Sequence, residues 1–115
     1  MTVAESPGTG PGWVPSACTL PTTEQPLRAA EFDEVFATDV LAVHAGPDEV
    51  RLELRPDAGV AARVAGLAVR ETSCCSFFTF DLHAADGRVE LTIRTGPAHR
   101  EVLSALADRA VSRSR

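Results

Sequence analysis

The stretch 78-FTFDLHAADGRVELTI-93 decides the fold. Apolar and polar residues alternate on both sides of the dipeptide Asp86-Gly87, which is a strong signal for a tight hairpin turn. The apolar positions are Phe78, Phe80, Leu82, Val89, Leu91 and Ile93. A period of two residues is typical of strands that have one buried and one wet face, so the stretch predicts an antiparallel hairpin covered on one side.

Outward from this hairpin, residues 50–54 show the same alternation, and Pro56 ends it. Residues 41–45 are either the hairpin partner of that strand or the end of the preceding helix. A short strand is expected at residues 17–20, before Pro21. Apolar residues at helical spacing predict three helices: one from the Thr22 capping box to about residue 40, one over 57–73 and one over 97–110.

These elements predict an α+β fold, a two-layer sandwich in which helices cover one face of an antiparallel sheet. If residues 41–45 form a strand, the order is ferredoxin-like with an additional C-terminal helix. If they do not, the order is thioredoxin-like. One domain is expected at residues 17–111, between a flexible N-terminal arm at 1–16, which contains Trp13, and a frayed tail at 112–115.

The composition excludes several classes of function. The 115 residues carry a formal charge of −5, and all 11 cationic side chains are Arg, so a basic nucleic-acid-binding patch is not expected. The absence of Lys removes phosphate-binding P-loops and Schiff-base chemistry. No apolar run is long enough for a membrane span, and the first residues show no secretory signal, so we expect a cytoplasmic protein.

The three cysteines are the unusual chemistry of this chain. In a reducing compartment they are expected to be thiols, ligands or redox groups rather than a structural disulfide. Cys18 lies near the end of the first strand, and Cys74 and Cys75 lie at the exit of the second helix. Both candidate topologies bring these two junctions to the same sheet edge, whereas His44 joins them only in the ferredoxin-like order.

Three converging thiols predict a sulfur-rich site for a soft ion, with His44 as a further candidate ligand. Glu71, three residues before Cys74, is a candidate proton-handling group, although a Glu at this position commonly only solvates a helix end. Adjacent cysteines can bind one ion only if the backbone bends at the helix exit. Alternatively, one cysteine of the pair is a buried small apolar residue.

Two segments resemble a group of small bacterial proteins with the pattern C-T/S-L … E-x-x-C-C-x-F-F. The matching residues are Ala17 to Leu20 and Glu71 to Phe80. Similar segments stand alone or are attached to regulators of the mercury-resistance type. The resemblance implies thiol chemistry on soft metals or metalloids. In that group a Pro commonly follows the cysteine pair, where this chain has Ser76.

We therefore expect a cytoplasmic protein that binds Hg(II), As(III), Cu(I) or Zn(II) through Cys18, Cys74 and Cys75. Whether it is an enzyme stays open. A second hypothesis is a thiol-disulfide oxidoreductase whose nucleophile is Cys18, because this thiol precedes a helix start. A third is a non-catalytic interaction domain that contacts a regulator or a second copy through its sheet face. That face is expected to carry ion pairs among the charged residues of its strands, Arg51, Glu53, Arg55, Asp81, Arg88, Glu90 and Arg94.

Overall fold

The computed structural model describes residues 25–74 and 77–114. Its helices and strands are α1 (Gln25–Asp39), β1 (Val40–Ala45), β2 (Glu49–Leu54), α2 (Ala58–Cys74), β3 (Phe78–Ala85), β4 (Arg88–Thr95) and α3 (Arg100–Ser114). A short 3-10 turn, Pro97–His99, precedes α3. The chain thus repeats a helix followed by a hairpin before it ends in α3. The expected strand at residues 17–20 lies outside the described residues.

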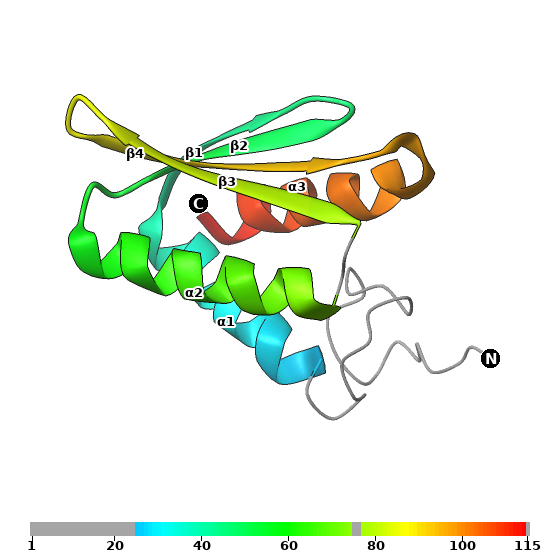
Figure 1. Ribbon diagram of the computed structural model, residues 1–115, viewed down its shortest axis with the longest axis horizontal. Coiled ribbons are helices and arrows are strands. Elements are labelled where there is room, and N and C mark those ends of the chain that lie inside the picture. The colour runs from blue at the N-terminus through cyan, green and yellow to red at the C-terminus, as the bar shows by residue number, and fades with distance from the viewer. Residues whose placement is uncertain (1–24, 75–76, 115) are drawn as a thin grey trace.

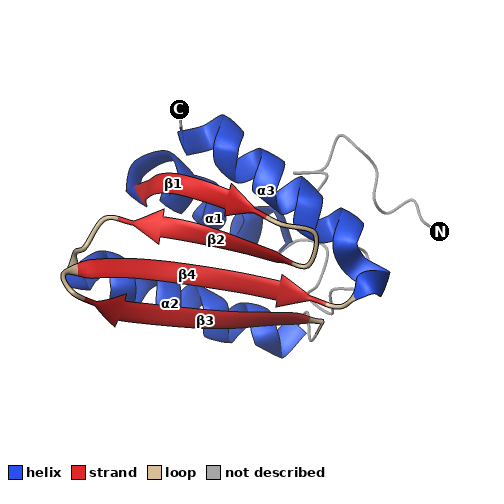
Figure 2. Ribbon diagram, turned by 90° about the horizontal axis from the view of Figure 1, so that it is seen from above, coloured by secondary structure: helices blue, strands red, loops and turns tan. Residues whose placement is uncertain are grey.

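The predicted two-layer α+β sandwich is confirmed. Figure 1 shows the three helices on one side of the antiparallel sheet, and Figure 2 shows the other face of that sheet without a covering helix. α3 lies under β1, α2 lies under β3, and α1 contacts both of these helices. Residues 41–45 belong to a strand, and α3 continues through residues 112–114, where a frayed tail is expected.

The strand order is β1-β2-β4-β3, with every neighbouring pair antiparallel. The ferredoxin-like order, which places residues 17–20 beside β2, is not confirmed. β4 occupies that position, because β2 pairs with β1 on one side and β4 on the other. The second strands of the two hairpins therefore form the centre of the sheet, and the first strands form its edges.

The buried core follows the alternation of the central strands. Val50, Leu52 and Leu54 of β2 pair directly with Ile93, Leu91 and Val89 of β4, and all six are buried on the side of the helices. The helices complete this core with Phe32, Val35, Phe36, Val60, Val64, Leu67, Leu103, Leu106, Ala107 and Ala110. On β3, the apolar side chains on the helix side of the sheet are buried only at the start of the strand. Phe78 is buried, whereas Leu82 is 39% exposed.

The predicted turn between β3 and β4 has the expected geometry. Asp86 and Gly87 have φ angles of 54° and 72°, and the pair Ala85–Arg88 flanks them. Positive φ at both central residues is the signature of a type I′ turn, whose twist matches that of the two strands. Because Gly has no Cβ, it adopts this conformation without steric strain.

The uncovered sheet face carries the expected ion pairs. Arg94 bridges Glu49 of β2 and Asp81 of β3, and Arg88 donates to Glu53 at 3.1 Å. Arg51 and Glu90 are 3.9 Å apart. Exposed pairs of this kind contribute about 0 to 1 kcal/mol each, so they define a polar surface more than they stabilise the fold.

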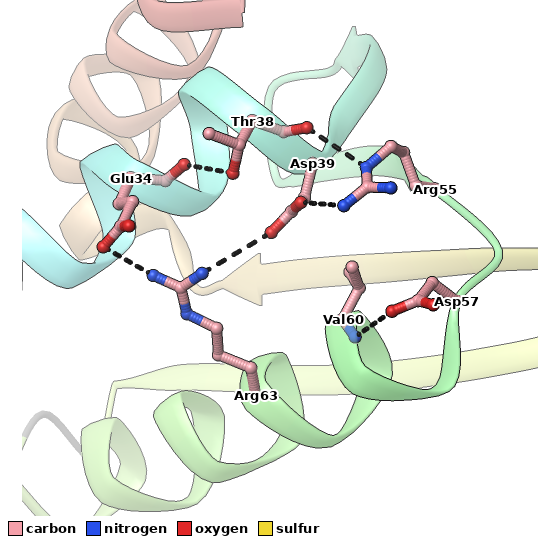
Figure 3. Close-up of polar contacts among 7 residues, drawn as sticks. All are labelled: Glu34, Thr38, Asp39, Arg55, Asp57, Val60 and Arg63. Carbon is pink, nitrogen blue, oxygen red and sulfur yellow. Dashed lines mark hydrogen bonds and ion pairs between the residues drawn. The ribbon is translucent and has the colours of Figure 1, made fainter.

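Arg55 does not belong to this face, contrary to expectation. The strand ends at Leu54, and Arg55 instead donates from Nη2 to Oδ1 of Asp39 at 2.8 Å and from Nε to the carbonyl oxygen of Thr38 (Figure 3). Asp39 is buried at the junction of α1 and β1. Its other carboxylate oxygen lies 3.8 Å from Nη1 of Arg63 on α2, so one buried carboxylate connects three elements.

Candidate functional site

The end of α2 carries two of the three predicted site residues that the structure describes, Glu71 and Cys74. They lie three residues apart on the last turn of the helix, which places them on neighbouring positions of its surface. Glu71 is only 6% exposed, so it does more than solvate the helix end. Cys74 is the last residue of α2, and Cys75 and Cys18 lie outside the described residues.

The start of α2 is fixed by a side-chain cap. Asp57 accepts a hydrogen bond from the backbone N–H of Val60 through Oδ2 at 3.0 Å (Figure 3), which satisfies a donor that the helix itself cannot. The inward face of α2 then packs against the sheet through Val64 and Leu67. Glu71 continues this same face at the next turn, which explains its burial.

Two ion pairs join α2 to α1 and define their relative direction. Arg63 contacts Glu34 at 2.7 Å, and Arg70 contacts Glu31 at 3.5 Å. Residue numbers therefore rise along α2 as they fall along α1, so the two helices are antiparallel (Figure 1). The first turn of α1 consequently lies at the end of α2 that carries Cys74.

This arrangement limits how far Cys18 can be from the cysteine pair. Cys18 precedes the first residue of α1, Gln25, by seven positions. A chain of that length reaches at most about 24 Å when fully extended. This connection is therefore long enough for Cys18 to reach the end of α2 that carries Cys74.

Phe77, two positions after the cysteine pair, connects this region to the turn before α3. The ring of Phe77 stacks on His99 with a centroid distance of 4.0 Å and an interplanar angle of 22°. Thr95 donates from Oγ1 to the carbonyl oxygen of Phe77 at 3.1 Å. Among the described residues, His99 in the turn before α3 is therefore the imidazole that contacts Phe77, two positions after Cys75. Its position in the sequence gave no indication of this contact.

His44 lies elsewhere. It pairs with Arg51 on the helix-free face of β1, and β1 and β3 are opposite edges of the sheet. Three strand spacings of about 4.8 Å separate those edges by about 14 Å. The described structure therefore does not bring His44 to the end of α2, and we leave it out of the proposed site.

The local charge at the end of α2 is negative. The unpaired carbonyl groups of a helix C-terminus carry partial negative charge, and Glu71 lies one turn away. Such surroundings disfavour a free thiolate but favour a bound cation. Among the described residues, no group of three or more His, Cys, Asp or Glu side chains is arranged to hold a metal ion. A metal centre here would therefore need Cys75 or Cys18.

No protein-family model matches the chain, and neither curated proteins nor solved structures match it at a significant level. Within residues 25–74 and 77–114, none of the helices combines the length and the apolarity that spanning a bilayer requires. The case for a function consequently depends on the chemistry of the residues themselves.

Proposed function

We propose that this protein binds a thiophilic metal or metalloid ion through Cys18, Cys74 and Cys75. The antiparallel arrangement of α1 and α2 carries this proposal, because it brings the first turn of α1, which Cys18 precedes by seven positions, to the end of α2 that carries Cys74. Thiolate ligands select soft ions such as Hg(II), As(III), Cu(I) and Zn(II). The resemblance to proteins attached to mercury-resistance regulators supports the same class of ligand.

The electrostatics of the helix end supports ion binding over thiol-disulfide exchange. An exchange reaction needs a thiolate before its partner arrives, and the helix C-terminus and Glu71 oppose that charge. A metal cation instead supplies the positive charge that deprotonates its own thiol ligands. Glu71 either accepts one of the protons that leave, the others going to solvent, or stays ionised and offsets part of the charge of the bound ion.

Metal titration of the reduced full-length protein tests the proposal. Charge-transfer absorbance in the ultraviolet, recorded while Hg(II), As(III), Cu(I) or Zn(II) is added anaerobically, should saturate at one ion per chain for at least one of them. Each of Cys18→Ser, Cys74→Ser and Cys75→Ser should lower the affinity. Binding that is the same in all three variants, or no binding of any of the ions, would refute the proposal.

The Glu71 assignment has its own control. Glu71→Gln keeps the shape of the side chain, and we expect a loss of about 10-fold to 100-fold in ion affinity, as is usual for groups that support metal ligands. Asp108→Asn, on the exposed side of α3 and nine positions beyond His99, removes a carboxylate away from the site and should leave affinity unchanged. Circular dichroism of both variants separates a loss of binding from a loss of folding.

A redox enzyme would give a different result. Protein without bound metal that forms a mixed disulfide at Cys18 with a small disulfide, and is then resolved by Cys74 or Cys75, would identify a thiol-disulfide oxidoreductase. Mass spectrometry of the trapped adduct distinguishes the two chemistries directly.

A further inference from the structure

The two edges of the sheet differ in their ability to accept another strand. β1 spans six residues, and its register with β2 shifts between Val40 and Ala42, a bulge that bends the edge away. β3 spans eight residues and keeps a regular register along its whole length. Among the described residues no strand pairs with the outer edge of β3, and residues 81–85 are all exposed. Such an edge is a template for strand pairing.

The neighbourhood of this edge is apolar. Leu82 is 39% exposed on the helix side of β3. A hollow of about 420 Å³ lies between the start of α2 and the end of β3, and Ala61 and Ala84 are part of its lining. Arg63 and Arg70, the charged residues of α2 outside its core face, form ion pairs with Glu34 and Glu31 of α1. The helix side of this edge thus exposes apolar side chains, which fits an apolar partner on that side.

We propose that β3 pairs with β3 of a second copy of this chain, antiparallel and with the two-fold axis at Leu82, so that two four-stranded sheets become one continuous sheet. The sequence of β3 is complementary to itself in this register. Asp81 lies opposite His83 of the second copy, and Phe80 lies opposite Ala84 of the second copy. The two Leu82 side chains meet at the axis, where each covers the exposed surface of the other.

Charge selects this register over its neighbours. A two-fold axis at Asp81 would place the two Asp81 carboxylates directly opposite each other, which is destabilising. An axis at His83 would place the two imidazoles opposite each other and leave Asp81 facing Ala85. Only the axis at Leu82 pairs acidic with basic side chains, and it does so twice, once on each side of the axis.

Backbone geometry is compatible with this pairing. Because the two-residue turn is flanked by the pair Ala85–Arg88, alternate residues of β3 direct their N–H and C=O groups away from β4. These residues are Phe80, Leu82 and Ala84, and their pairing across the axis forms roughly six backbone hydrogen bonds. The half-exposed ring of Phe80 then lies beside the hollow next to Ala84 of the second copy, so a large side chain meets a small one.

Sedimentation of the full chain over a range of concentrations tests the proposal. We expect a reversible monomer–dimer equilibrium for the unmodified protein. Leu82→Glu places two carboxylates at the axis and should raise the dimer dissociation constant at least about tenfold. The matched control is Leu41→Glu, an exposed leucine on the other edge strand that is 58% exposed, which should leave the dissociation constant unchanged.

The register has a separate test. His83→Asp places a carboxylate opposite Asp81 of the second copy and should weaken the dimer about tenfold, since two attractive pairs become repulsive. A protein that stays monomeric at millimolar concentration would overturn the proposal. A dimer that withstands Leu82→Glu, for example one formed through the ion-paired sheet face, would overturn it as well. Because all three positions are exposed, circular dichroism should show native folding in each variant.

Discussion

Removing the partner of the buried Asp39 carboxylate should destabilise the fold by an amount that the contacts allow us to work out. The Asp39 side chain is 4% exposed, and its short charged hydrogen bond runs to Arg55, whose side chain is 51% exposed. Hydrogen bonds to charged groups contribute about 1.5 to 3 kcal/mol, and exposure of the Arg reduces this one to the lower half of that range. Arg55→Ala should therefore lower the free energy of unfolding by about 2 kcal/mol.

Arg63 provides the internal comparison. Its guanidinium lies 3.8 Å from Asp39, too far for a hydrogen bond, and its other partner, Glu34, is 64% exposed. Arg63→Ala should thus cost only about 0.5 kcal/mol. Both values come from urea unfolding followed by far-ultraviolet circular dichroism, with unchanged m-values as the check for two-state behaviour.

A double-mutant cycle isolates the Asp39–Arg55 interaction itself. Asp39→Ala, Arg55→Ala and the double variant should give a coupling energy of about 1 to 1.5 kcal/mol. The backbone hydrogen bond from the Arg55 N–H to the Asp39 carbonyl, 2.9 Å long, is present in all of them and cancels. A coupling energy below about 0.3 kcal/mol, or equal losses for Arg55→Ala and Arg63→Ala, would refute this reasoning.

Three further predictions concern the core, the hairpin turn and the candidate site. Ile93→Ala, at a fully buried position of β4, should lower the free energy of unfolding by about 2 to 5 kcal/mol, measured by urea unfolding. Gly87→Ala should lower it by about 1 kcal/mol, because the φ angle of 72° strains a residue with a Cβ; an unchanged midpoint would contradict the turn geometry. His99→Ala should reduce ion affinity about tenfold in the metal titration, whereas His44→Ala should not; the reverse order would move the site to the other sheet edge.

The local structure of this chain could be predicted because its signals are short-range. Alternation and the Asp86-Gly87 dipeptide predicted the β3–β4 hairpin, and the structure confirms both its register and its turn. The helices follow equally from apolar spacing. The alternation that continued through Arg55 was misleading, because nothing in the sequence of β2 indicates that Asp39, 16 positions earlier, accepts a hydrogen bond from its guanidinium.

The strand order could not be predicted, because it depends on which strands compete for the centre of the sheet. Residues 17–20 and β4 were both candidates for the place beside β2. β4 has eight residues and three fully inward apolar side chains, so its pairing buries far more apolar surface than a segment of four residues. The same uncertainty made His44 a candidate ligand, since its distance from the cysteine pair depends on the order of the strands.

The candidate site does not depend on the strand order alone. In the ferredoxin-like order a central strand at residues 17–20 brings Cys18 to the cysteine pair, whereas β4 takes that place beside β2. The ion pairs Arg63–Glu34 and Arg70–Glu31 supply a different reason, because they bring the first turn of α1 to the last turn of α2. Exchanging the charges of Arg70 and Glu31 together should therefore leave ion affinity unchanged. Arg70→Glu alone should weaken it, because it loosens the contact between the first turn of α1 and the last turn of α2.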